Sequence, residues 1–229
     1  MEEFDRSTSL TASTKSGTRS RNKRYFIPFV AAAGSIALCA SMAFAGGNAA
    51  YADTYSSNVV AAASNVTSGT IPAGQLSVVN FHPKWGDKQA NKDSMLKYIA
   101  DAHANGVKMI VFPEMALTGY VSSDDPDSAA YRMAVSQAET TESPITRELA
   151  RAASANGMWV IYGTSEKIPG DADHAYNSAF AISPSGQVSA YQKIAPVEGK
   201  WAVPGSTPVI LQTEWGMMGL SICYDTYAQ

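Results

Sequence analysis

The stretch that decides the fold is Gly219-Leu220-Ser221-Ile222-Cys223-Tyr224-Asp225. A short apolar run here ends on a thiol, and Cys223 is the only cysteine outside the N-terminal apolar segment. Val111-Phe112-Pro113-Glu114 ends another apolar run on a carboxylate, and Tyr191-Gln192-Lys193 ends a third run on an ammonium. Each run is short enough to be a strand. The pattern therefore predicts that strand ends carry a thiol, a base and a cation, which together suit acyl transfer.

Strand and helix patterns alternate in the first part of the domain. Apolar runs predict strands over three segments, which are 76–81, 107–112 and 158–163. Met95, Ile99 and Ala102 recur at i, i+4 and i+7, which predicts a helix over 88–105. Ser143-Pro144 supplies an N-cap followed by a proline at the first helical position, so a second helix is predicted to run from there to Gly157. Strands joined by helices predict helices packed on a sheet.

Hairpin patterns follow in the second part of the domain. The turn sequence Ser183-Pro184-Ser185-Gly186 separates strands predicted at 175–182 and 187–192. In the same way, Glu214-Trp215-Gly216 separates strands predicted at 208–212 and 217–223. The sequence thus predicts an α/β domain whose last strand ends at the thiol.

The three segments, in this order, resemble the nitrilase (carbon-nitrogen hydrolase) superfamily over residues 76–229. The resemblance extends to Met115-Ala116-Leu117-Thr118-Gly119-Tyr120 after the carboxylate and to Tyr176-Asn177-Ser178-Ala179 before the lysine. It implies an α/β fold, the α-β-β-α sandwich of the nitrilase type, with no cofactor and with a homodimer as the default assembly. Superfamily domains continue for several more strands and helices after the nucleophile, so a chain that stops at Gln229 is expected to be truncated at the C-terminus.

The resemblance also implies a role for each of five residues. Cys223 is the nucleophile, Glu114 is the general base that takes the thiol proton, and Lys193 stabilises the thiolate and the oxyanion. The backbone amide of Tyr224 is the second oxyanion donor. Glu198 is the candidate for a second glutamate that positions the lysine. Its spacing from the lysine is shorter than the superfamily pattern, and an exposed loop glutamate is an equal alternative.

The implied function is hydrolysis of non-peptide carbon-nitrogen bonds in small amides or N-carbamoyl compounds. The thiolate would form a thioester that water then cleaves, and a nitrile would follow the same path through a thioimidate. Ala195 stands where many members have histidine two places after the lysine, which leaves the substrate open. Acyl transfer to an amine also stays open. The competing interpretation is a truncated, catalytically silent protein that at most binds small molecules.

Other classes of site find less support in the sequence. His82, His103 and His174 permit a Cys-His enzyme, but none of them lies in a recognisable motif. No His, Cys and carboxylate cluster has metal-ligand spacing, and no Gly-rich phosphate loop is present. Beyond residue 24 the chain carries 11 basic and 17 acidic residues, a formal charge of −6. This acidic balance disfavours a nucleic-acid partner.

The first 52 residues have the pattern of an export signal or a membrane anchor. Arg19-Ser20-Arg21-Asn22-Lys23-Arg24 precedes 25–45, a run of 21 residues without charge. The small-residue patterns Ala43-Phe44-Ala45 and Ala50-Tyr51-Ala52 favour cleavage, whereas the length of the run also allows a spanning helix. The composition of 53–75 predicts a linker, which leaves 76–229 as the hydrolase domain. We therefore expect an exported protein, secreted or at the cell surface, with membrane anchoring as the alternative.

Overall fold

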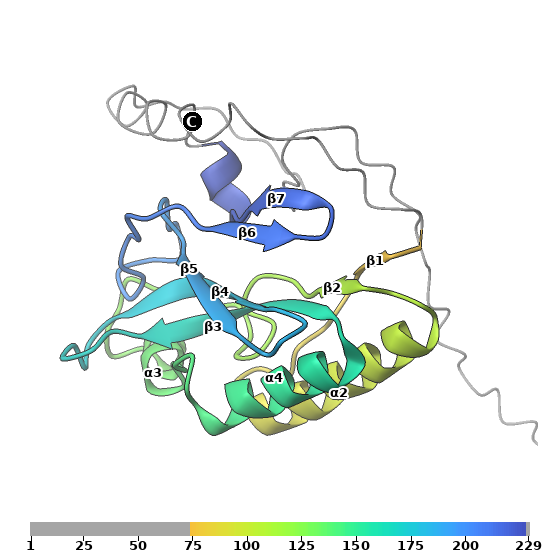
Figure 1. Ribbon diagram of the computed structural model, residues 1–229. Coiled ribbons are helices and arrows are strands. Elements are labelled where there is room, and N and C mark those ends of the chain that lie inside the picture. The colour runs from red at the N-terminus through yellow and green to blue at the C-terminus, as the bar shows by residue number, and fades with distance from the viewer. Residues whose placement is uncertain (1–73, 228–229) are drawn as a thin grey trace, which may run out of the picture.

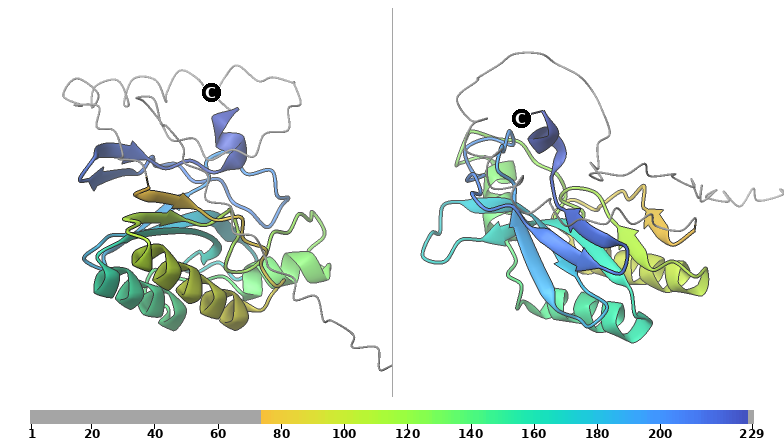
Figure 2. Two further views of the ribbon diagram at one scale, coloured as in Figure 1. Left: turned by 90° about the vertical axis from the view of Figure 1, so that its right-hand side faces the viewer. Right: turned by 45° about the horizontal axis from the view of Figure 1, so that its top comes forward.

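The computed structural model of the protein describes residues 74–227. In this part of the chain, a five-stranded sheet lies between a layer of helices and a β-hairpin (Figure 1). The turned view in Figure 2 shows these layers one above the other. The predicted signal or anchor, residues 1–52, and nearly all of the predicted linker lie outside the described residues.

The sheet has the strand order β1-β2-β3-β4-β5. Its strands are β1 (Leu76–Val78), β2 (Met109–Val111), β3 (Trp159–Lys167), β4 (Ala175–Ile182) and β5 (Val188–Gln192). The first three strands are parallel, and β3, β4 and β5 form antiparallel pairs. All five predicted strands of this sheet are present. β3 is longer than its prediction because it pairs with β4 as far as Lys167, which lies opposite Ala175.

Three helices accompany the sheet in the described residues. They are α2 (Lys88–Ala104), α3 (Ala129–Ser136) and α4 (Pro144–Asn156). The predicted caps are present, since Ser143 accepts a hydrogen bond from the backbone of Thr146 and Gly157 ends α4 with a φ of 58°. The helix α3 was not predicted because its 8 residues are too few to give a clear period.

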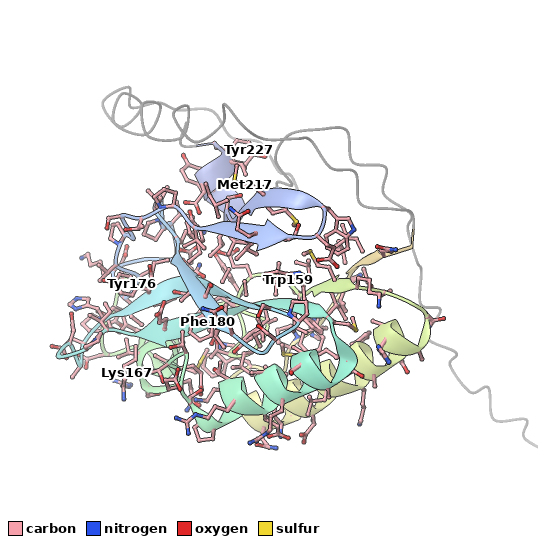
Figure 3. The ribbon with its side chains drawn as sticks, in the orientation of Figure 1. Trp159, Lys167, Tyr176, Phe180, Met217 and Tyr227 are labelled. Carbon is pink, nitrogen blue, oxygen red and sulfur yellow. The ribbon has the colours of Figure 1, made fainter. Side chains whose placement is uncertain are left out.

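The core occupies both faces of the sheet. On one face, α2 and α4 lie side by side and bury Ile99 and Leu149 against Tyr162 and Phe180 (Figure 1). On the other face, the hairpin of β6 (Ile210–Thr213) and β7 (Gly216–Gly219) buries Leu211 against Trp159, which lies between sheet and hairpin in Figure 3. Because side chains alternate along a strand, neighbouring residues of β3 serve opposite faces.

The chain around Cys223 differs from the prediction. The predicted strand 217–223 was wrong at its end, because β7 stops at Gly219 and Cys223 opens a short 3₁₀ helix, η2 (Cys223–Thr226). Cys223 has a φ of 45°, which lies in the left-handed region and is incompatible with a strand. The carboxylate of Asp225 accepts a hydrogen bond from the backbone of Ile222 at 2.9 Å, so a local side-chain bond replaces strand pairing here.

Candidate active site

Glu114 lies in a tight turn that follows β2. The turn rests on β3, where the backbone N–H of Gly163 donates to the carbonyl of Pro113 at 3.2 Å and the carbonyl of Gly163 accepts from Leu117 at 3.0 Å. Met115 has a φ of 55°, which reverses the chain immediately after the glutamate. Two backbone bonds to one residue of β3 therefore fix where the Glu114 side chain begins.

Lys193 follows β5 directly, and its side chain is fully buried. Its ammonium donates to Oε1 of Glu114 at 2.8 Å and to the carboxylate of Glu198. Asn177 of β4 donates its amide N–H to the same Oε1 of Glu114 at 2.7 Å. The structure thus brings three of the predicted site residues into one hydrogen-bonded cluster.

The contact of Asn177 with Glu114 was missed by the sequence analysis. The residue appeared there only within the segment that precedes the lysine. Its position follows from strand pairing, because the carbonyl of Asn177 accepts a hydrogen bond from the backbone of Lys193 at 2.8 Å. That pairing places the amide beside the lysine and toward the turn that carries the carboxylate. Extending the pairing of the predicted hairpin by one residue beyond β5 would have placed Asn177 opposite Lys193.

Burial and charge act against each other in this cluster. Burial raises the pKa of the Glu114 carboxyl above its ordinary value of 4.5, although the Lys193 ammonium opposes this change. Burial also opposes the charge on Lys193, but the carboxylates of Glu114 and Glu198 together outweigh it and hold the pKa of the ammonium above 10.5. Lys193 is therefore a cation, and Glu114 is a carboxyl with raised proton affinity, as general acid-base chemistry requires.

Glu198 lies beside the lysine and not on the protein surface. Its side chain is fully buried, and its second carboxylate oxygen accepts a hydrogen bond from the backbone of Val197 at 3.0 Å. Its own carbonyl accepts from Ser123 at 2.9 Å, which ties its loop to the chain that follows the Glu114 turn. The structure thus rejects the exposed-loop alternative for this residue.

Cys223 lies on a turn that packs on the residues around the lysine. Ile222, which precedes it, is buried against Tyr191 and Ile194 on either side of Lys193. Cys223 itself is exposed, and so is Tyr224, the next residue of η2. The turn therefore leaves Cys223 exposed to solvent, while Ile222 anchors the turn to the residues on either side of Lys193.

Tyr120 is a further residue of the site that sequence analysis did not single out. Its side chain is half exposed. Partial burial raises the pKa of its phenol, and the negative charges of Glu198, Glu114 and Cys223 raise it further. The proton affinity of the Tyr120 phenol therefore depends on the charges of this cluster.

The three histidines lie in separate places. His82 is exposed after β1, His103 lies in the last turn of α2, and His174 binds Asp171 of its own loop at 2.9 Å. Among residues 74–227, no group of three His, Cys, Asp or Glu side chains could hold a metal ion. The helices of the same range include none with the length and apolar character needed to cross a membrane.

Comparison of the sequence with known proteins identifies nitrilases, a cyanide hydratase and an omega-amidase among its relatives. The chain is 29% identical to an aliphatic nitrilase from Sinorhizobium fredii over 170 residues, which covers 67% of this chain and 53% of that protein. It is 26% identical to a nitrilase from Pyrococcus abyssi over 156 residues, which covers 67% of this chain and 56% of that protein. The chain therefore spans about half the length of the curated relatives that it matches.

Solved structures match in fold. An amidase from Nesterenkonia sp. aligns with a TM-score of 0.51 at 22% identity, covering 65% of this chain and 55% of that chain. A CN-hydrolase superfamily protein from Xanthomonas campestris aligns with a TM-score of 0.57 at 17% identity, covering 67% of this chain and 54% of that chain. These matches confirm the predicted nitrilase-type fold. The family model described as carbon-nitrogen hydrolase matches residues 74–229, which is more than half of the sequence, and the chain therefore belongs to the carbon-nitrogen hydrolase family.

Proposed function

We propose that the protein hydrolyses non-peptide carbon-nitrogen bonds of small amides or N-carbamoyl compounds through a thioester on Cys223. The observation that carries this proposal is the buried contact of Lys193 with Glu114 and Glu198, next to the segment on which the cysteine turn packs. Amidases and nitrilases among the matched proteins support this class of substrate. A nitrile would react along the same path through a thioimidate.

The reaction begins with proton transfer from the Cys223 thiol to Glu114. The thiolate attacks the carbonyl carbon, and the carbonyl π electrons move to oxygen to give a tetrahedral oxyanion. Lys193 and the backbone N–H of Tyr224 stabilise that oxyanion. As the carbon-nitrogen bond breaks, Glu114 returns the proton to the leaving ammonia or amine. Water then attacks the thioester with Glu114 as base, which releases the acid and regenerates the thiol.

Two features of the cluster support these roles. The raised pKa of Glu114 moves its proton affinity closer to that of a thiol, so proton exchange between the two groups costs less free energy. Glu198 accepts a hydrogen bond from Lys193 and has no other side-chain partner among the described residues, so its proposed role is to hold the ammonium toward the site. Neither proton transfer to Glu114 nor stabilisation of the oxyanion by Lys193 requires a metal or an organic cofactor.

The proposal also includes export of the protein and assembly into a homodimer. The uncharged run 25–45 after a basic segment supports export, with an uncleaved membrane anchor as the alternative. A homodimer is proposed from the resemblance to the superfamily alone. The small-molecule substrate is the proposed partner, and the acidic charge of the chain beyond residue 24 disfavours nucleic acid.

The proposed function is tested by ammonia release from a panel of amides, N-carbamoyl compounds and nitriles. We expect release that Cys223→Ala abolishes, together with an acyl adduct on Cys223 in acid-quenched protein. Free carboxylic acid as the product indicates hydrolysis, whereas an N-substituted amide formed with added amine indicates acyl transfer. Binding of a panel member with neither ammonia nor an adduct would overturn the proposal in favour of a catalytically silent protein.

A further inference from the structure

The carboxylate of Asp225 makes three hydrogen bonds that join two segments. Within the cysteine turn, Oδ2 accepts from the backbone N–H of Ile222 at 2.9 Å. The other two bonds reach the segment 191–195, which contains Lys193. Oδ2 accepts from the phenol of Tyr191 at 2.7 Å, and Oδ1 accepts from the backbone N–H of Ala195 at 2.8 Å. Hydrogen bonds to a carboxylate are among the strongest in proteins.

The partners of Asp225 lie on both sides of the lysine. Tyr191 precedes Lys193 by two residues, and Ala195 follows it by two. Tyr191 is almost completely buried in the small cluster that also contains Ile222. One carboxylate therefore fastens the turn that bears Cys223 to the segment that bears Lys193, at a point before the lysine and at a point after it.

The backbone of Cys223 needs such a constraint. Its φ of 45° is rarely adopted by residues other than glycine and persists where the surroundings impose it. The bond from Ile222 to Asp225 closes the turn across this residue, and the backbone N–H of Asp225 donates back to the carbonyl of Ile222 at 3.0 Å. The aspartate thus holds the cysteine in its conformation and holds the turn against its neighbour.

We propose that Asp225 is a positioning residue that fixes the Cys223 thiol relative to the Lys193 ammonium. This inference rests on the proposed function, in which Cys223 is the nucleophile and Lys193 stabilises its thiolate. Asp225 does not touch the substrate in this role. It acts through the turn, and its loss lets the thiol move away from the cation.

The sign of the effect separates positioning from direct electrostatics. Removal of a negative charge beside a thiol stabilises the thiolate and lowers the pKa of the thiol. Loss of contact with a cation has the opposite effect and moves the pKa upward, toward about 8.5 for an unperturbed cysteine. The proposal requires the upward direction in Asp225→Ala, although this variant removes a negative charge.

The experiment measures alkylation of the 229-residue protein by iodoacetamide as a function of pH, with the adduct read on the peptide that contains Cys223. We expect the midpoint in Asp225→Ala to rise by about one pH unit. Tyr191→Phe removes one of the three bonds and is expected to give a smaller rise. Asp171→Ala is the matched control, because Asp171 accepts backbone hydrogen bonds from Asp173 at 2.9 Å and His174 at 3.0 Å within its own loop.

A double-variant cycle tests whether Asp225 acts through Lys193. Lys193→Met alone is expected to raise the same midpoint, and Asp225→Ala in that background is expected to give no further rise, because the upward effect of Asp225→Ala requires the Lys193 cation. Asp225→Asn, which preserves the size of the side chain, replaces Asp225→Ala if the latter does not fold. If the alkylation midpoint of Asp225→Ala is unchanged or lower while its melting temperature drops, the positioning role is overturned. Since alkylation needs no substrate, this result is distinct from failure of ammonia release.

Discussion

A Cβ atom added to Gly163 would lie 2.3 Å from the backbone nitrogen of Met115. Real Cβ atoms do not approach other atoms so closely, and glycine is the residue that permits this contact of backbone with backbone. Met115 directly follows Glu114, so the absent side chain on β3 is what lets the turn of the proposed base rest on the strand.

Gly163→Ala is expected to destabilise the protein by about 1–3 kcal/mol, because the added methyl group forces the turn off the strand. Urea unfolding measures this change. Gly219→Ala is the matched control, since a Cβ at Gly219 meets nothing within 4 Å, and it should change the free energy of unfolding by less than about 0.5 kcal/mol. Equal stability of the two variants would contradict the close approach.

Lys193→Met is expected to cost about 3–5 kcal/mol of stability. The fully buried carboxylate of Glu198 and the carboxylate of Glu114, whose side chain is 18% exposed, would lose the cation between them. Glu198→Gln in the same chain should recover part of the loss by removing one uncompensated charge. Lys92→Met is a suitable comparison. Lys92 is also buried, but its partners Asp93 and Glu148 have side chains that are 51% and 42% exposed, so they remain solvated when the lysine is lost. A cost for Lys92→Met that matches the cost for Lys193→Met would contradict this explanation.

The pH dependence of ammonia release is expected to follow the ionisation of the Glu114 carboxyl. The proposed base works when deprotonated, so the rate should rise as the pH increases through the pKa of Glu114, which burial raises above 4.5. Glu114→Gln should lower the rate by about 10²–10⁴ and remove this acid limb. A limb that persists in Glu114→Gln would assign the titration to another group.

Glu166→Gln is expected to stabilise the protein at neutral pH. Burial raises the pKa of Glu166 despite its hydrogen bonds from Ser178 at 2.6 Å and Gln192 at 3.0 Å. The folded state therefore binds the proton more tightly than the unfolded state, and stability is lost as pH rises through the raised pKa. Glutamine keeps an acceptor oxygen without the charge.

Urea unfolding from about pH 4 to about pH 7 checks the sign of this effect. The advantage of Glu166→Gln over the unchanged protein should grow as the pH rises. Glu142→Gln is the control, because the Glu142 side chain is 76% exposed and pairs with Arg147 at the surface. A Glu166→Gln variant that is less stable at pH 7 than at pH 4, relative to the unchanged protein, would refute the prediction.

Export is expected to remove the residues before about Asp53. The observation behind this expectation is the basic segment that ends at Arg24 and the uncharged run 25–45 after it. Intact-mass measurement on secreted protein should give a chain that begins near Asp53. A membrane-retained form that still includes Met1 would favour an anchor.

The sequence located Glu114 and Lys193 because each follows a short apolar run, and strand ends can be predicted from such local patterns. The bonds of Asn177 to Glu114 and of Asp225 to Tyr191 could not be predicted in this way. Each joins residues far apart in the sequence, and a local pattern carries no information about such pairs. The prediction of a strand up to Cys223 was wrong at its end for a related reason. A short apolar run does not show where a strand ends, and Asp225, which accepts the hydrogen bond that turns the chain, lies beyond that run.

The order of the site residues along the chain affects how the site is assembled. Glu114, Asn177, Lys193 and Glu198 all precede Cys223, and so do the five strands of the sheet in the described residues. Synthesis proceeds from the N-terminus, so these four residues enter the nascent chain before Cys223 does. The thiol is therefore the last of these five groups to be synthesised, and a nascent chain that ends before residue 223 has the residues of the polar cluster without the proposed nucleophile.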